Sequence, residues 1–302
     1  MIECTGLGKS YGTTRAVDNM SFTIPDGVVT GFLGPNGSGK STSMRLMLGL
    51  DFGEGTTLFD GRKLADLEST TKVVGAHLDA KNFHPTRTAR DHLRMLGQEA
   101  QVSNARVDEV IDLLGLASVA NKAPGGFSLG MGQRLGLAGA ILASPKTLLL
   151  DEPANGLDPQ SIHWLRDFLR DYAAEGNSVF VSSHLLSEME LLADHLVVIA
   201  KGRLMADESM DEFVARSKTD VLVRTVPEFT SVLSAALRER GAEVLAEDGA
   251  FAVSGVEAAQ IGMMAHELGA PVLELTVRQA SLEQAFLEIT EGQQGFRTGG
   301  SK

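Results

Sequence analysis

The chain has 302 residues, 43% of them hydrophobic, which is enough for one large domain and a smaller one, each with a core. Its net charge of −12 argues against general affinity for nucleic acid, because a phosphate backbone attracts basic surfaces, so we expect no nucleic-acid partner. The single cysteine, Cys4, excludes an internal disulfide and favours a reducing cytoplasm. The sequence predicts no signal peptide and contains no run of about 18 apolar residues, so we expect another chain to supply any membrane part.

The first two-thirds of the sequence alternate short apolar runs with helical patterns. Residues 28–33 predict a buried strand, and a helix follows over residues 42–50 after a glycine-rich segment. The other strands that we expect in this part span 147–150, 178–181, 195–200 and 203–205. Such alternation predicts an α/β fold with a mainly parallel sheet covered by helices on both faces.

Residues from about 88 to 144 interrupt this alternation with helical patterns alone. We expect helices over 88–101, 105–114 and 132–143, so this part forms a helical insertion. The domain with its insertion is expected to end at residue 217.

Residues 218–290 predict a separate, smaller α+β domain. Strand and helix patterns follow one another in the order βαββαβ, which is typical of a ferredoxin-like fold. Its last helix, over 281–289, carries an apolar stripe that is either ordinary core or a docking surface. The tail, residues 291–302, is rich in Gly and Gln and is expected to be disordered.

The glycine-rich segment between the first buried strand and its helix has the pattern of a phosphate-binding loop. It consists of Gly34, Pro35, Asn36, Gly37, Ser38, Gly39, Lys40, Ser41 and Thr42. Its glycines let backbone N–H groups approach phosphates, Lys40 reaches the β- and γ-phosphate oxygens, and the Ser41 hydroxyl can bind Mg²⁺. The segment therefore predicts a P-loop nucleoside triphosphatase with magnesium as cofactor.

Two strand ends further along the chain carry candidate catalytic groups. Asp151 and Glu152 follow an apolar strand, where Asp151 would hold Mg²⁺ and Glu152 would polarise the attacking water. His184 follows another strand and could contact the γ-phosphate. An acidic pair at a strand end is common by chance and a lone histidine is often structural, so each gains meaning only from the phosphate-binding loop.

Ser128 and Gly130 open a helix, and a helix start with a hydroxyl and free N–H groups can bind an anion. Taken alone, Ser128 could equally be an ordinary N-cap.

With these motifs in this order, residues 1–217 resemble the ATP-binding subunits of ABC transporters. The resemblance implies ATP as substrate and a switch role for His184, and it places Tyr11 where an aromatic ring stacks on adenine. It identifies a signature segment that acts on a neighbouring subunit, namely Ser128, Leu129, Gly130, Met131, Gly132 and Gln133. It also identifies a loop that crosses to the partner, namely Asn155, Gly156, Leu157 and Asp158.

Within that family the chain is similar to the bacitracin and daunorubicin resistance type of antibiotic and multidrug exporter. The signature carries Leu129 where the common form has glycine, as that subgroup does. Asp79 stands where most members carry a glutamine; a carboxylate can still bind Mg²⁺, but the amide donor is lost.

The resemblance implies that ATP lies between the phosphate-binding loop of one subunit and the signature of another. We therefore expect a dimer with a second copy of the chain, and a polytopic permease on a separate chain at the cytoplasmic face of the membrane. The alternatives are a non-transport ATPase of the ABC type, acting in translation or repair, and a simple P-loop kinase or GTPase. The translation type carries two nucleotide domains and the repair type a coiled-coil or zinc insertion, neither of which this chain shows.

Overall fold

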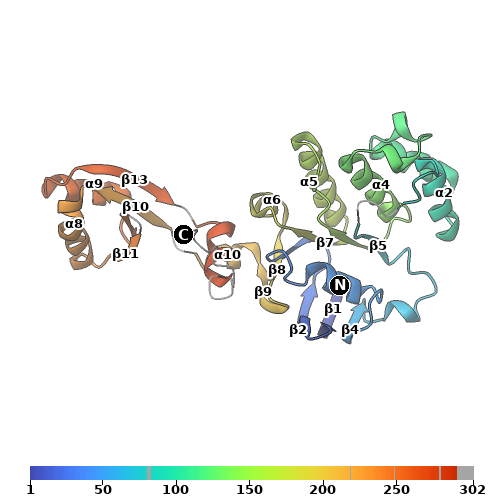
Figure 1. Ribbon diagram of the computed structural model, residues 1–302, viewed down its shortest axis with the longest axis horizontal. Helices are drawn as coiled ribbons and strands as arrows, with labels where there is room; N and C mark the ends of the chain where they lie inside the picture. The colour runs from blue at the N-terminus through green and yellow to red at the C-terminus, as the bar shows by residue number, and fades with distance from the viewer. Residues whose placement is uncertain (80–82, 218, 248, 279, 291–302) are drawn as a thin grey trace. The chain divides into compact units, whose positions relative to one another are not determined.

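The computed structural model describes residues 1–79, 83–217, 219–247, 249–278 and 280–290 (Figure 1). The chain divides into two compact units, residues 1–210 and 211–291, so the first unit ends before the boundary expected at residue 217. The expected disordered tail, 291–302, lies outside the described residues. None of the described helices has the length and apolar character needed to cross a membrane.

A six-stranded sheet forms the centre of the first unit. Its strand order is β5-β6-β7-β3-β8-β9, in which the first five strands are parallel and β9 is antiparallel to β8. These strands span Val74–His77, Thr147–Asp151, Ser178–Ser183, Val29–Leu33, His195–Ala200 and Arg203–Ser209. Three helices accompany them: α1 (Lys40–Met47), α5 (Pro159–Ala174) and α6 (Leu186–Leu192). The sheet confirms the predicted α/β class, although α1 begins at Lys40 rather than at residue 42.

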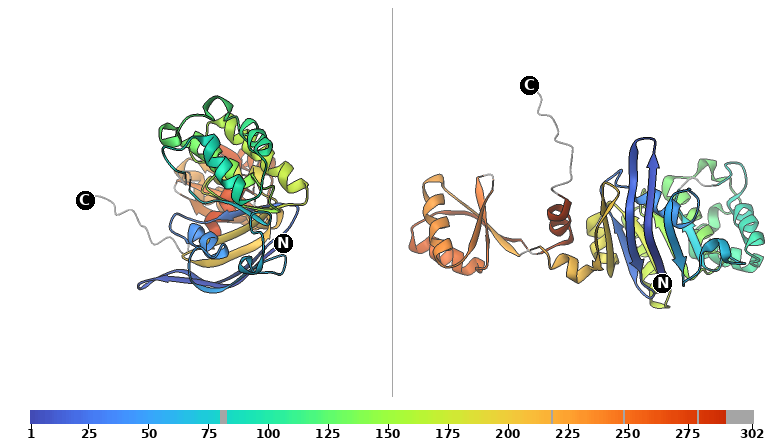
Figure 2. Two further views of the ribbon diagram at one scale, coloured as in Figure 1. Left: turned by 90° about the vertical axis from the view of Figure 1, so that its right-hand side faces the viewer. Right: turned by 90° about the horizontal axis from the view of Figure 1, so that it is seen from below.

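A second, antiparallel sheet in this unit was not expected from the sequence. It has the order β2-β1-β4, with β1 (Ile2–Tyr11) and β2 (Thr14–Ile24) forming a long hairpin, drawn in blue in the right-hand view of Figure 2. β4 spans Glu54–Phe59. The rings of Phe22, Phe32 and Phe180 stack in the core that both sheets share, with 4.8 Å between the last two centroids.

The helical insertion lies between β5 and β6 and contains α2 (Ala89–Glu99), α3 (Asn104–Leu113) and α4 (Leu129–Ile141) (Figure 1). A hydroxyl caps the start of each helix, because the side chains of Thr88, Ser103 and Ser128 accept backbone N–H groups of the first turn. Capping fixes the first residue of α4 at Leu129, earlier than the apolar pattern over 132–143 had indicated.

The second unit contains a four-stranded antiparallel sheet of order β11-β12-β10-β13. Chain order is β10 (Asp220–Thr225), α8 (Pro227–Glu239), β11 (Glu243–Glu247), β12 (Ala250–Ser254), α9 (Ala258–Glu267) and β13 (Val272–Arg278). This order and pairing are those of a ferredoxin-like fold, as predicted. Both helices pack on one face of the sheet, where Val223 and Phe251 meet Leu233 and Ile261 in a buried core.

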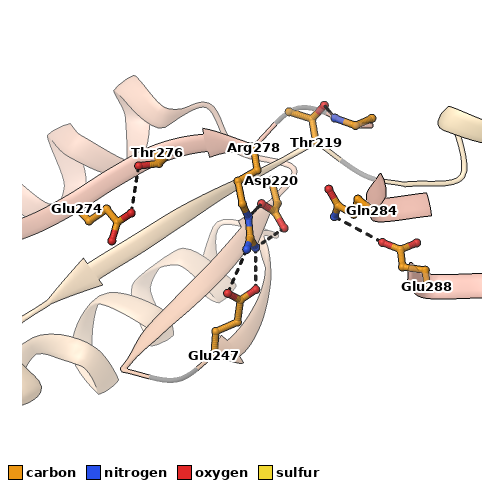
Figure 3. Close-up of polar contacts among 9 residues, drawn as sticks. Thr219, Asp220, Glu247, Glu274, Thr276, Arg278, Gln284 and Glu288 are labelled. Atoms are coloured by element: carbon orange, nitrogen blue, oxygen red, sulfur yellow. Dashed lines mark hydrogen bonds and ion pairs between the residues drawn. The ribbon is translucent and has the colours of Figure 1, made fainter. Parts of the chain in front are cut away.

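The opposite face of that sheet carries ion pairs. Arg278 of β13 donates two hydrogen bonds to the facing carboxylate of Asp220, at 2.7 and 2.8 Å, and two more to Glu247, at 2.7 and 3.1 Å (Figure 3). Planar guanidinium groups suit such two-pronged contacts. The arrangement ties the two outer strands to the centre of the sheet.

Two short helices flank this sheet in the chain, α7 (Met210–Val214) and α10 (Leu282–Thr290). Ser281 donates its backbone N–H to the Ser217 hydroxyl at 3.2 Å, so the segments after α7 and before α10 are joined. The apolar stripe expected on the last helix is largely inside the protein, because Leu282, Ala285 and Phe286 are buried.

Candidate active site

The phosphate-binding loop connects β3 to α1 and lies against neighbouring backbone. Gly39 has φ 109°, and a Cβ there would lie 2.5 Å from the carbonyl oxygen of Ala16 on β2. A Cβ at Gly34 would lie 2.5 Å from the carbonyl oxygen of Ile199 on β8. Glycine is therefore required at position 39 by conformation and by space, and at position 34 by space alone.

Lys40 is buried at the start of α1, with 7% of its surface exposed. Its ammonium group donates to the carbonyl oxygens of Gly34 at 2.7 Å and Pro35 at 3.4 Å, which leaves one of its three donors for a ligand. Burial lowers the pKa of Lys40, whereas the carboxylates of Glu152 and Asp151 raise it, so both acidic groups lie close enough to act on the lysine. The Ser38 hydroxyl is also buried and lacks a hydrogen-bond partner among the described residues; a phosphate oxygen would supply one.

Ser182 of β7 forms hydrogen bonds with both acidic residues at the end of β6. Asp151, the last residue of β6, pairs with Ser182 in the parallel ladder. The Ser182 hydroxyl donates to Asp151 Oδ1 at 2.5 Å and accepts the backbone N–H of Glu152 at 2.9 Å. Glu152 itself has φ 50°, the left-handed region that residues other than glycine avoid.

His184 and Glu152 meet beyond the carboxyl ends of β7 and β6. The His184 Nδ1 lies 2.7 Å from Glu152 Oε2, and both side chains are accessible, 45% and 21% exposed. The structure thus brings Lys40, Asp151, Glu152 and His184 together at the edge where parallel sheets bind ligands.

The signature segment forms the start of α4, next to the loop of residues 155–158. Ser128 is exposed, and its hydroxyl accepts the backbone N–H of Met131 at 3.3 Å as an N-cap. A Cβ at Gly130 would lie 2.9 Å from the carbonyl oxygen of Gly156, so the segment and the loop pack closely. Asp158, which ends the loop, caps α5 by accepting the N–H of Ser161 at 2.8 Å, and this bond lowers the pKa of Asp158.

Gln133 lies away from the exposed start of the signature helix, although it was grouped with the residues that act on a partner. It is 5% exposed, and its Nε2 donates to the carbonyl oxygen of Glu152 at 3.2 Å while Oε1 bonds to His77 Nε2. Burial lowers the pKa of His77, although Gln133 opposes this. Helical periodicity could have shown the difference, because Gln133 lies about 140° around the helix from Ser128. The roles of His77 and Ser182 were missed, since each depends on a contact between distant segments.

Tyr11 ends β1 on the same hairpin that touches the phosphate-binding loop. Its ring is half-exposed, its hydroxyl donates to Asp51 Oδ2 at 3.0 Å, and the Lys9 ammonium lies 5.1 Å from the ring centroid. An exposed ring on this hairpin is compatible with stacking on a base, which stays a prediction.

Asp79 follows β5 and is exposed. It precedes residues 80–82, which lie outside the described part, and its magnesium role stays a prediction. No group of three or more His, Cys, Asp or Glu side chains in the described ranges forms a metal cluster by itself. Mg²⁺ in nucleotide sites needs only one or two protein ligands besides phosphates, so Asp151 and Ser41 fit that ion.

Comparison with known families agrees with this geometry. Residues 17–155 match the family model described as ABC transporter, and residues 219–283 match a domain of unknown function (DUF8746). The chain is 32% identical to the bacitracin transport ATP-binding protein BcrA of Bacillus licheniformis over 97% of this chain and 98% of that protein. It is 35% identical to the lantibiotic transport ATP-binding protein SrtF of Streptococcus pyogenes over 70% of this chain and 92% of that protein.

Solved structures share the fold of the first unit. One is a dimeric ATP-binding cassette in a post-hydrolysis state with ADP and Pi, with a TM-score of 0.62 and 23% identity over 70% of this chain and 99% of that chain. The full-length similarity to a transport ATP-binding protein, together with the phosphate-binding loop, carboxylates and histidine at one sheet edge, shows that the chain is an ATPase and belongs to the ABC transporter ATP-binding family.

Proposed function

We propose that this chain powers an exporter of an antibiotic, drug or other hydrophobic compound, working at the cytoplasmic face of the membrane with a permease on a separate chain. Support comes from the named relatives, one described as transporting bacitracin and another as transporting lantibiotics, the first of which is similar along nearly the whole chain.

The observation that carries the proposal is that one chain has two separate sets of groups for ATP, one for its own nucleotide and one for the nucleotide of a partner. The first set consists of Lys40, Glu152 and His184. The second is the exposed start of α4 at Ser128, which offers N–H groups and a hydroxyl to an anion bound by another subunit. Two copies of the chain would therefore place ATP between the phosphate-binding loop of one and Ser128 of the other.

The chemistry in such a pair is positioning plus charge stabilisation. Lys40 would hold the β- and γ-phosphates, Glu152 would polarise the attacking water, and His184 would orient Glu152 and contact the γ-phosphate. Mg²⁺ held by Ser41 and Asp151, with Asp79 after the neighbouring strand β5 as a further candidate ligand, would neutralise phosphate charge.

The test is Glu152→Gln, which keeps the side-chain shape and removes the base. We expect this variant to bind ATP, to hydrolyse it at least about 100-fold more slowly, and to form a dimer that depends on ATP and magnesium, as measured by light scattering. Glu175→Gln, which changes an exposed carboxylate at the end of α5, is the matched control. A Glu152→Gln variant that stays monomeric with saturating ATP and magnesium would contradict the shared site.

Identifying the transported compound requires an experiment on the complete transporter. Copurification of the permease, followed by measurement of which compounds stimulate ATP hydrolysis, separates drug export from a non-transport ATPase. An ATPase that associates with no membrane protein would contradict the exporter.

A further inference from the structure

A chain of hydrogen bonds links the signature helix to the backbone of Glu152 within one subunit. The Gln133 side chain on α4 donates from Nε2 to the Glu152 carbonyl oxygen at 3.2 Å. Its Oε1 can only accept, so the contact with His77 is donated by the imidazole Nε2–H. The side chains of Gln133 and His77 are 5% and 4% exposed, and so the bonds are shielded from competition by water.

Gly136 makes the contact of His77 with the helix possible. It lies nearly one turn beyond Gln133 on α4, and a Cβ there would be 2.1 Å from the Cε1 atom of the His77 ring. The imidazole therefore lies directly against the helix backbone, with little space to turn away from Gln133. The end of β5 and the middle of α4 are joined through this ring.

The backbone at Glu152 needs such support. With φ 50° it occupies a conformation that costs roughly 1 kcal/mol or more and persists only where surrounding groups hold it. The Ser182 hydroxyl accepts its N–H, and Gln133 donates to its carbonyl oxygen. These two bonds, from β7 and from α4, fix the peptide groups on either side of the catalytic side chain.

We propose that Gln133 is a positioning residue for Glu152, held in place by His77, and that it transmits movement of the signature helix to the carboxylate of the same subunit. The transmission rests on the proposed function, in which Ser128 at the start of α4 receives the partner's nucleotide. Because Gln133 lies within two turns of Ser128 on one continuous helix, a shift at the helix start displaces its amide as well. Binding of ATP at one site would thereby change the position of the catalytic carboxylate at the other site.

The first experiment compares two substitutions that remove hydrogen bonds with one that restores a donor. Gln133→Met keeps the length of the side chain, His77→Leu removes the imidazole donor, and His77→Gln places an amide nitrogen near the position of Nε2. We expect kcat for ATP hydrolysis to fall about tenfold in the first two while the Kd for ATP changes less than about twofold, because misplaced groups slow chemistry before they weaken binding. His77→Gln should recover most of the rate, and Leu137→Met, a buried change on the same helix, should leave it unchanged.

Three results overturn positioning: an unchanged kcat, an equal loss of kcat and ATP affinity, or a His77→Gln variant as slow as His77→Leu. If Gln133→Met does not fold, as judged by thermal unfolding, the two His77 variants decide the question by the same criteria.

The second experiment asks on which subunit Gln133 acts. Glu152→Gln and the double variant with Gln133→Met should form ATP-dependent dimers to the same extent by light scattering. Loss of the dimer in the double variant alone shows that Gln133 acts across the interface, which overturns the proposal. Absence of a dimer in Glu152→Gln itself rejects the proposed function and the transmission, whereas the kcat comparison still tests positioning within the subunit.

Discussion

His184 and Glu152 lie 32 residues apart in the chain, and their side chains are joined by a contact of 2.7 Å between Nδ1 and Oε2. A carboxylate accepts hydrogen bonds, so Nδ1 carries the proton and Nε2 is left to face a ligand. His184 therefore orients the side chain of Glu152, while Ser182 and Gln133 hold its backbone.

Replacing His184 should slow turnover without unfolding the protein. We expect His184→Ala to lower kcat by about 10- to 100-fold, because the carboxylate loses its orienting partner. His163→Ala is the control, since His163 on α5 is exposed and makes a similar contact, 2.9 Å from Asp167. Equal activities of the two variants in steady-state ATPase assays would remove the role assigned to His184.

Lys40→Ala should weaken ATP binding by at least about 100-fold, since it removes a buried ammonium group from a phosphate site. Isothermal titration calorimetry measures the affinity, and Lys122→Ala, an exposed lysine of the helical insertion, serves as control. ATP affinity equal to that of the parent would mean that the loop of residues 34–42 does not hold the phosphates.

The first unit should bind ATP without the second, provided that the chain is cut at the structural boundary. We expect a protein ending at Met210 to be soluble and to keep the parent's ATP affinity, because the phosphate-binding loop, Glu152 and His184 all precede that residue. A cut after Ser217 would instead remove Ser281, whose backbone N–H binds the Ser217 hydroxyl. A soluble protein ending at Met210 that binds no ATP would refute this independence of the two units.

Cys4 should be inert in the folded protein. Burial raises the pKa of its thiol to about 12, although the Thr57 hydroxyl opposes this. At pH 8 only about one thiol in ten thousand is ionised, and the thiolate is the reactive form, so a chromogenic thiol reagent should label the chain only after denaturation. Rapid labelling of the native protein would show that Cys4 is accessible.

The raised pKa of the Cys4 thiol makes the free energy of unfolding depend on pH. The thiol of the unfolded chain ionises near its ordinary pKa of 9.0, whereas the folded one ionises near 12. The contribution of Cys4 to the free energy of unfolding is therefore complete below pH 9 and is lost between about pH 9 and 12. A Cys4→Ser variant should show a shallower decline across that interval in urea unfolding.

Much of the catalytic edge could be predicted because its signals are local. The loop of residues 34–42, Asp151 with Glu152, and His184 each follow an apolar strand, and parallel strands end at one edge. The βαββαβ order of the second unit was likewise visible from periodicity alone.

The remainder depends on contacts that periodicity does not encode. Strands β1, β2 and β4 were missed because each mixes buried with exposed positions and because β1 and β4 contain glycines. The contact of Gln133 with Glu152 requires α4 to cross the end of β6, which no local pattern specifies.

At residue 152 the side chain serves catalysis, whereas the backbone conformation costs stability. Its φ of 50° would suit glycine without strain, so Glu152→Gly should relieve roughly 1 kcal/mol of backbone strain while it abolishes the carboxylate. Screening for turnover would reject that change, whatever the backbone gains from it. A programme that aims to make this ATPase more robust should therefore leave position 152 unchanged and seek its gains elsewhere in the chain.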